Sequence, residues 1–113
     1  MPFIEIRVSK PVDEATKEKL QAEIVAIMET IPGKNASNTT ICICDTYTIY
    51  KEHELIEAAF IDIRLYKESP EDSKKDFVGK MFSIIDNVLS IPPDRVQMNF
   101  FEQPCWAANG ELF

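Results

Sequence analysis

The sequence has few of the residues on which most catalytic and cofactor-binding sites depend. Its 113 residues include one histidine, three glycines and three cysteines. A single histidine, His53 in a charged Lys-Glu-His-Glu stretch, supplies no metal-ligand spacing and no Ser/His/Asp or Cys/His arrangement, and we expect it to be a solvated linker residue. Three scattered glycines form no phosphate-binding loop. We therefore expect no metal site and no phosphate-binding loop, and the usual catalytic residues are nearly absent.

Basic residues are also scarce, with 12 against 19 acidic residues and a net charge of −7. This balance argues against nucleic acid and anionic membranes as partners. No apolar run approaches the ~20 residues that a membrane span needs. The start, Met-Pro-Phe-Ile-Glu-Ile-Arg, lacks the basic-then-apolar order of a signal peptide. We therefore expect a cytoplasmic protein.

The cysteines give no disulfide framework, because their number is odd. Cys42 and Cys44 are two residues apart, so on a strand they share one face, which disfavours a disulfide between them. We expect both to be buried, reduced thiols rather than metal ligands.

The strongest signal present is an internal repeat. The segment Phe3-Ile4-Glu5-Ile6-Arg7-Val8 reappears as Phe60-Ile61-Asp62-Ile63-Arg64-Leu65, 57 residues later. Each copy is followed by an apolar stripe with helical spacing and then by residues that alternate as on a half-buried strand. The stripes are Leu20, Ile24, Ile27, Met28 and Ile31, and Phe77, Met81, Ile84, Ile85 and Val88; the alternating residues are Thr39, Ile41 and Ile43, and Val96, Met98 and Phe100.

We interpret the chain as a single domain, residues 1–113, made of two β-α-β units. Repeat 1 covers residues 2–45, a linker with a candidate short strand at 47–50 covers 46–58, repeat 2 covers 59–102, and a C-terminal segment covers 103–113. Gly33 is expected to cap the first helix, and Ser69 and Pro70 to begin the second as N-cap and first helical residue. Asn109-Gly110 predicts a tight turn.

The predicted fold class is α+β: a four-stranded mixed sheet with two helices on one face. Both first strands bury the same parity of residues, so both helices lie on the same side. The other side carries Phe3, Glu5, Arg7, Phe60, Asp62 and Arg64. We expect further copies of the chain to cover this face, and acids on it to pair with arginines across strands; the alternative is the solvated sheet face of a monomer.

Pro2 is the one candidate for chemistry that the residues themselves suggest. Removal of Met1 would leave a secondary amine at the start of a strand, whereas the equivalent position in the second repeat is Ala59. Burial and a nearby cation would both lower the pKa of this amine by disfavouring its charged form. A neutral amine at pH 7 can act as a general base.

Several short motifs together resemble the tautomerase superfamily, in the branch of macrophage migration inhibitory factor and D-dopachrome tautomerase. The resemblance covers the whole chain. Its motifs are Pro2 opening an isoleucine-rich strand, Gly33-Lys34 after the first helix, Pro93-Asp94-Arg95-Val96 leading to Asn99, and Trp106 with Phe113.

The resemblance implies a homotrimeric barrel with three sites at subunit boundaries and no cofactor. It implies that Pro2 transfers the proton in keto–enol tautomerisation of a 2-oxo acid such as an arylpyruvate. Lys34 resembles the lysine that holds the carboxylate of this small-molecule substrate, and Asn99 the asparagine supplied by the neighbouring subunit. The remaining matches are the site-lining isoleucine, Ile63, and an aromatic and apolar wall, Trp106 and Phe113.

The sequence departs from that pattern in four places. Gln97 replaces a pocket tyrosine, which weakens the expectation of an aromatic substrate. Tyr50–Glu54 replaces a glycine-rich loop, and Leu55 and Ala58 replace a Cys-x-x-Cys pair. Arg64 replaces a glycine; it would either bind a second carboxylate of the substrate or line the barrel, and the strand parity favours the barrel.

Two further functions remain open. A dehalogenase or decarboxylase of the same superfamily would need a carboxylate and paired arginines, for which Glu5 and Arg64 are candidates. A cytokine-like or scaffold trimer would keep the pocket without catalysis. Taken singly, Lys34 would be an exposed lysine at a helix end, Asn99 a strand residue with a satisfied amide, and the two C-terminal aromatic residues subunit packing.

Overall fold

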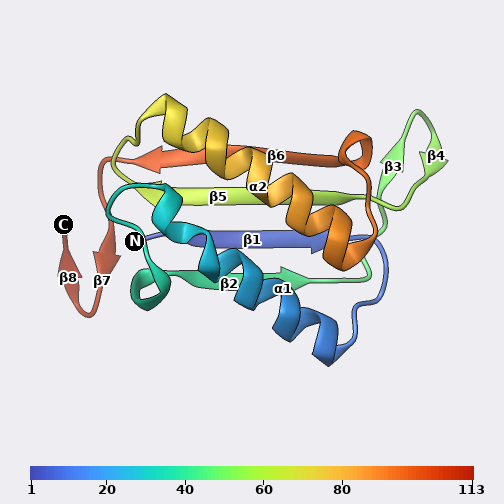
Figure 1. The fold of residues 1–113 in the computed structure, drawn as a ribbon, viewed down its shortest axis with the longest axis horizontal. Helices are drawn as coiled ribbons and strands as arrows, with labels where there is room; N and C mark the ends of the chain where they lie inside the picture. The colour runs from blue at the N-terminus through green and yellow to red at the C-terminus, as the bar shows by residue number, and fades with distance from the viewer.

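The computed structural model describes residues 1–113 and is built around one four-stranded sheet (Figure 1). The strands lie in the order β2-β1-β5-β6, with β1 at Phe3–Val8, β2 at Thr40–Cys44, β5 at Ala59–Tyr66 and β6 at Val96–Gln103. β1 and β2 are parallel, as are β5 and β6, while β1 and β5 are antiparallel. The predicted mixed sheet of two β-α-β units is confirmed.

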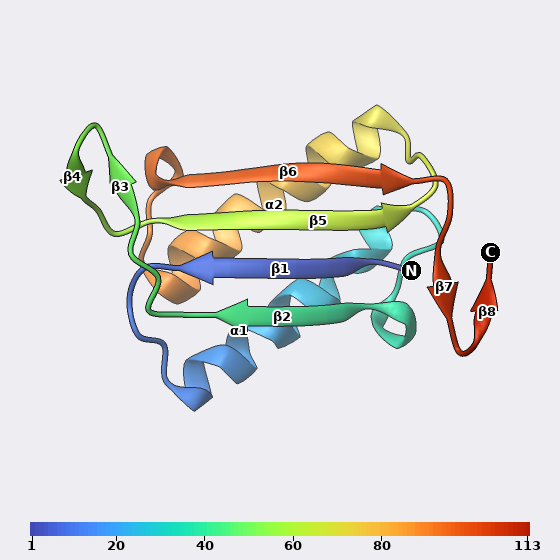
Figure 2. The same cartoon turned by 180° about the vertical axis from the view of Figure 1, so that it is seen from behind.

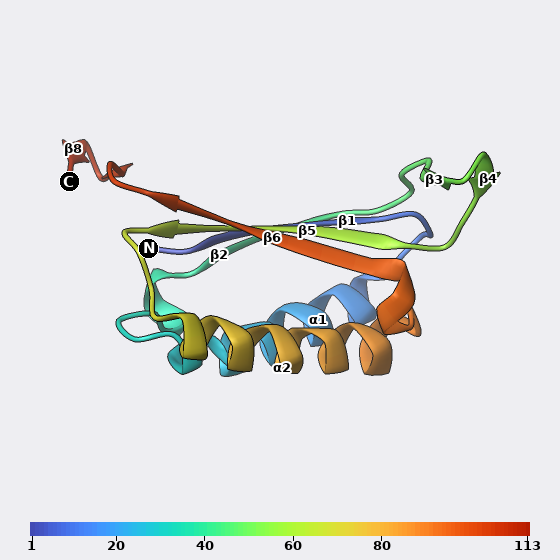
Figure 3. The same cartoon turned by 90° about the horizontal axis from the view of Figure 1, so that it is seen from above.

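Two α-helices, α1 at Glu14–Ala26 and α2 at Glu71–Leu89, pack on the same face of this sheet (Figure 3). The view from behind shows that neither helix covers the opposite face (Figure 2). The alternation of buried residues along β1 and β5 explains this arrangement, because it gives each strand one apolar side to pack against a helix. No helix combines the length and apolar character needed to span a membrane.

The core lies between the sheet and the helices, and its centre is formed by residues of both repeats. The fully buried large side chains are Phe77, Ile4, Ile6, Leu20, Ile24, Met28, Ile31, Ile61, Ile63, Leu65, Met81 and Ile85. The predicted stripe of the second helix is buried as far as Ile85, but the helix ends on buried Leu89, and Val88 is only partly buried.

The first helix is shorter than its apolar stripe predicts. α1 ends at Ala26, and a short 3-10 helix at Met28–Thr30 continues the chain. Ile31 is extended because a residue that precedes proline is disfavoured in helical conformation. Gly33 has the expected positive φ of 79°, but the prediction that it caps α1 is wrong, because α1 ends seven residues earlier. Met28 and Ile31 reach the core from the 3-10 turn and the residue after it.

The start of the second helix is also displaced by one residue. α2 begins at Glu71 with Pro70 as its N-cap, where Ser69 had been expected as cap. Pro70 is extended, with ψ at 139°, so it cannot be the first helical residue. The main-chain N–H of Ser69 donates instead to Glu102 Oε2 over 2.6 Å, which ties the helix start to β6.

Two small hairpins extend from opposite ends of the sheet (Figure 1). One pairs β3, Tyr50–Lys51, with β4, Glu54–Leu55, so the predicted linker holds two short strands and the expected one at 47–50 is present only from Tyr50 on. The other pairs β7, Ala107–Ala108, with β8, Glu111–Leu112. Asn109 and Gly110 both have positive φ, 51° and 80°, which confirms the predicted turn.

The uncovered face of the sheet combines an ion-pair cluster with apolar side chains. Arg7 pairs with Glu5 and, over 3.1 Å, with Asp62 on the neighbouring strand, as expected. Asp62 is the only buried charged residue of the chain. Arg64 makes no ion pair; its guanidinium lies over the rings of Phe3 and Phe101, 5.7 and 5.8 Å from their centroids. Cations are attracted to aromatic faces in this geometry.

Candidate functional site

The start of β1 and the C-terminal hairpin lie at the same end of the sheet, as both ribbon views show (Figures 1 and 2). Pro2 is buried there, directly before β1. Its carbonyl oxygen accepts a hydrogen bond from the N–H of Thr40, 3.0 Å away, at the start of β2. This bond holds the chain end against the edge strand, so Pro2 occupies a fixed position.

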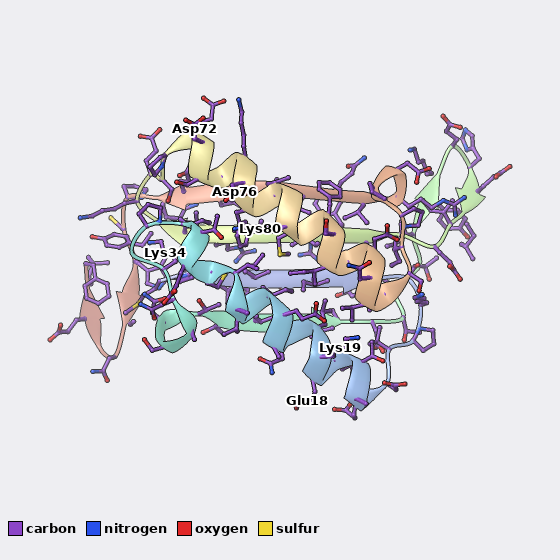
Figure 4. The ribbon with its side chains drawn as sticks, in the orientation of Figure 1. Glu18, Lys19, Lys34, Asp72, Asp76 and Lys80 are labelled. Carbon is purple, nitrogen blue, oxygen red and sulfur yellow. The ribbon has the colours of Figure 1, made fainter.

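Lys34 supplies a positive charge at this end of the molecule. Figure 4 shows Lys34 at the end of the sheet, whereas the other labelled charged residues lie along the two helices. Lys34 Nζ donates to the main-chain oxygen of Tyr66, 3.2 Å away, at the end of β5. The loop that carries Lys34 is itself braced by Asn38, whose Nδ2 donates to the carbonyl oxygen of Gly33 over 3.1 Å.

The amine at the chain end is electrostatically unusual. The pKa of the Met1 amine is lowered from 8.0 to about 6, first because the amine is partly buried and then because the Lys34 ammonium is its charged neighbour. Both causes disfavour the protonated form. The amine is therefore mostly neutral at pH 7, and a neutral amine can accept a proton.

The C-terminal hairpin contributes aromatic surface to the same end. The Phe113 ring lies 5.9 Å from the ring of Tyr66, and the N–H of Phe113 donates to the carbonyl oxygen of Trp106 over 2.7 Å. Trp106 is half-buried, while 44% of Phe113 is exposed. The structure thus brings four of the predicted site residues, Pro2, Lys34, Trp106 and Phe113, to one end of the sheet.

The other three predicted site residues lie elsewhere. Ile63 is fully buried in the core, opposite Ile4 on β1, and offers no surface in the single chain. Arg64 lies on the uncovered face, held over Phe3 and Phe101. Asn99 is on β6, across from Asp62, and so is level with the middle of β1 rather than with its start.

Asn99 has an unsatisfied acceptor. Its side-chain oxygen Oδ1 is buried without a hydrogen-bond partner, the only side-chain polar atom in this condition. The reading of Asn99 as a strand residue with a satisfied amide therefore does not hold in the single chain. Buried polar atoms are nearly always paired, so this oxygen has a free acceptor position that no donor of the single chain fills.

Sequence reasoning missed Tyr66, which both accepts the hydrogen bond from Lys34 and packs against Phe113. The signal was present in the strand pairing. Once β1 and β5 are antiparallel with Phe3 opposite Arg64, the register places Tyr66 opposite the residue before Pro2.

A pocket of about 190 Å³ lies at the opposite end of the sheet, far from Pro2. It is formed by the β3–β4 hairpin and the starts of β5 and β6, and among its lining residues are Tyr50, Ala59, Phe60, Arg95 and Gln97. Ala59 is the repeat equivalent of Pro2, so this pocket lies where the second β-α-β unit begins.

No protein-family model and no curated protein matches the sequence. The structure, in contrast, is similar to solved structures over nearly the whole chain. MIF2 of Leishmania major superposes with a TM-score of 0.92 at 21% identity, covering 100% of this chain and 97% of that one. The wild-type F6 fused 4-OT, an asymmetric trimer, superposes with a TM-score of 0.85 at 17% identity, covering 96% of this chain and 94% of that one.

Pt0534, in a structure inactivated by 2-oxo-3-pentynoate, gives a TM-score of 0.84 at 10% identity and covers 96% of this chain and 93% of that one. Similarity at these identities concerns the fold. The chain has the fold that macrophage migration inhibitory factor homologues and fused 4-OT share.

Proposed function

We propose that this protein is a cofactor-independent tautomerase that interconverts the enol and keto forms of a 2-oxo acid, with the amine of Pro2 as its base after Met1 is removed. The observation that carries the proposal is the lowered pKa of the Met1 amine, about 6, beside Lys34. After Met1 is removed, the amine of Pro2, the next residue at the same buried end of the sheet, would take this place beside Lys34. A shared fold adds support, because Pt0534 is inactivated by 2-oxo-3-pentynoate, which is itself a 2-oxo acid.

In this mechanism each residue at the N-terminal end of the sheet has a distinct task. Lys34 binds the carboxylate of the substrate and keeps the amine neutral. The amine of Pro2 accepts the hydroxyl proton of the enol and returns a proton to the adjacent carbon, which leaves the ketone. Trp106 and Phe113 form a wall that limits water at the reacting atoms. Positioned proton transfer of this kind contributes roughly 10²–10⁴-fold in rate.

We further propose that the chain works as a homotrimer with its uncovered sheet faces turned inward. Phe60 and Phe101 are exposed on that face, 37% and 41% respectively, and burial of such apolar surface favours association. The unsatisfied oxygen of Asn99 supports the same assembly. Asn99 would then meet a donor of the neighbouring copy and complete that copy's site.

The test combines intact mass with a ketonisation assay. Mass spectrometry is expected to find the chain without Met1. The absorbance of enol-phenylpyruvate is expected to decay faster in the presence of the wild-type protein than in buffer alone. The Pro2→Ala substitution is expected to lower kcat/KM by roughly 10²-fold or more. Pro11→Ala, at an exposed proline between β1 and α1, is the matched control and should retain wild-type activity.

Retained Met1, or undiminished turnover by Pro2→Ala, would overturn the proposal. A correctly folded trimer without proton-transfer activity toward any 2-oxo acid would favour the scaffold function instead. Release of chloride or carbon dioxide from 3-substituted acrylates or malonate semialdehyde would favour the dehalogenase or decarboxylase function.

A further inference from the structure

The two cysteines of β2 lie side by side on the face of the sheet that the helices leave uncovered. Cys42 and Cys44 alternate with Ile41 and Ile43, which pack against the core, so the thiols point the other way. Their Sγ atoms are 3.5 Å apart, and both side chains are half-buried. β2 is an edge strand, so the pair lies at the rim of the sheet.

Charged groups surround the thiols on the neighbouring strand. Glu5 is the cross-strand partner of Cys42, and Arg7 is the partner of Cys44. The hydrogen bond with Cys44, burial and the nearby Glu5 carboxylate raise the pKa of the Cys42 thiol, and the Arg7 cation opposes this in part. No group of three or more His, Cys, Asp or Glu side chains is arranged to hold a metal ion. The site therefore offers two sulfur ligands and no third.

We propose that Cys42 and Cys44 form a two-coordinate chelating site for a soft monovalent metal ion, Cu(I). Thiolates are soft ligands that select Cu(I). Zinc, the other common thiolate-bound ion, is tetrahedral and almost always takes four ligands, which this face does not supply. The site does not include Pro2; it lies on the sheet face that the proposed homotrimer turns inward, so the ion would bind within that assembly.

Binding exchanges two protons for one metal ion. Each thiol loses its proton, each sulfur donates an electron pair to Cu(I), and the product is a bis-thiolate complex with one net negative charge. No electron is transferred. The guanidinium of Arg7 beside Cys44, which also pairs with Glu5 and Asp62, offsets only part of that charge. The two Sγ atoms are close neighbours, so rotation of the two side chains, rather than movement of the strand, can bring both sulfurs onto one ion.

The experiment is an anaerobic competition between the reduced full-length protein and the bicinchoninate complex of Cu(I). Loss of the chelator's colour reports transfer, and native mass spectrometry reports stoichiometry. The wild type is expected to take one Cu(I) per chain. Cys42→Ser and Cys44→Ser are each expected to bind roughly 10²-fold more weakly, because a second ligand on the same chain binds at high effective concentration.

Cys105→Ser is the matched control, since Cys105 is an exposed free thiol outside β2 and should contribute nothing. Loss of binding in Cys105→Ser, wild-type binding in Cys42→Ser, or no transfer to the wild type would each overturn the proposal.

X-ray absorption of the loaded wild type gives a readout that does not depend on a variant's folding. Two sulfur neighbours around copper support the site, and a nitrogen or oxygen shell overturns it. Circular dichroism of the two serine variants is expected to match that of the wild type.

Discussion

Lys34 Nζ and the main-chain oxygen of Tyr66 lie 3.2 Å apart, and this hydrogen bond joins the loop after the first helical segment to the end of β5. The two residues come from different repeats, so neither β-α-β unit builds this end of the sheet alone. The bond fixes the position of the ammonium beside the chain-end amine. Charge and burial at this one end are therefore consequences of the packing of the two repeats.

Lys34→Gln is expected to raise the pKa of the Pro2 amine that removal of Met1 exposes, as Lys34 lowers the pKa of the Met1 amine in the structure. The neighbouring cation disfavours the protonated amine, so its removal stabilises that form. A general base must be neutral, so activity rises with pH through this pKa. The acid limb of the kcat/KM profile is expected to move to higher pH in the variant, with kcat/KM also reduced because the substrate carboxylate loses its cation.

Lys19→Gln is the control for this experiment, because Lys19 is an exposed lysine on α1 (Figure 4). Lys19→Gln removes the same charge far from the chain-end amine, so it should leave the pH dependence of kcat/KM unchanged. An unchanged acid limb in Lys34→Gln would show that Lys34 does not set the protonation state of the amine.

Glu102→Gln is expected to lower the free energy of unfolding by about 1 kcal/mol at pH 7. Burial would raise the pKa of Glu102, but the hydrogen bonds from Lys74 Nζ and the Ser69 N–H, each 2.6 Å, lower it below its ordinary value. A carboxylate whose pKa is lowered by folding stabilises the fold above its unfolded pKa and loses this contribution as the pH falls through the folded pKa.

The difference between wild type and Glu102→Gln should therefore shrink as the pH falls below about 4. Urea unfolding at pH 7 and pH 3 measures it. Glu68→Gln changes an exposed residue near the same helix start, so its free energy of unfolding should equal that of the wild type at both pH values. A pH-independent difference would mean that packing rather than charge accounts for the effect.

Arg7→Met is expected to lower the urea midpoint, because it leaves the buried Asp62 carboxylate without the partner that lies 3.1 Å away. Removing one member of a buried ion pair lowers the free energy of unfolding more than removing both members does, because the remaining charge stays buried without a partner. The double variant Arg7→Met with Asp62→Asn should therefore recover part of the loss. Strictly additive effects in this double-mutant cycle would contradict a direct coupling between the two side chains.

Phe101→Glu is expected to disrupt the proposed assembly by placing a carboxylate on the uncovered sheet face. Light scattering should give three times the chain mass of 12.9 kDa for the wild type and one chain for the variant. Ser83→Glu places the same charge on the exposed side of α2 and should remain trimeric. A wild type that runs as a single chain would remove the proposed role of Asn99 in a neighbouring site.

The architecture could be predicted from the sequence because the repeat and its periodicities determine it. Residues two apart in Ile4-Ile6-Val8 and Ile61-Ile63-Leu65 are all fully buried, so the strand faces and the side of the helices followed directly. The boundaries were less predictable. Pro32 keeps Ile31 extended, so the helical spacing could not continue to that residue. Pro70 is itself extended, so α2 begins one residue later than the capping residues predicted.

The candidate site was predictable only in part. Pro2 and Lys34 are brought together by β1 and by the loop before β2, which the motifs had marked. The main-chain oxygen of Tyr66 carries no side-chain signal, so only the strand register could place it beside Lys34. The 3.5 Å approach of Cys42 and Cys44 also depends on rotamers that a sequence does not specify.

The pocket beside Ala59 has a consequence for how many reactive ends one chain can have. Both halves of the molecule begin with a strand at a sheet end, and the second such end is hollowed by the β3–β4 hairpin. The nitrogen of Ala59, however, is acylated by Ala58, and an amide nitrogen has no basicity near neutral pH. The internal repeat thus doubles the strand-and-helix scaffold without doubling the free amine that the proposed base requires, so the second cavity has no equivalent of that base.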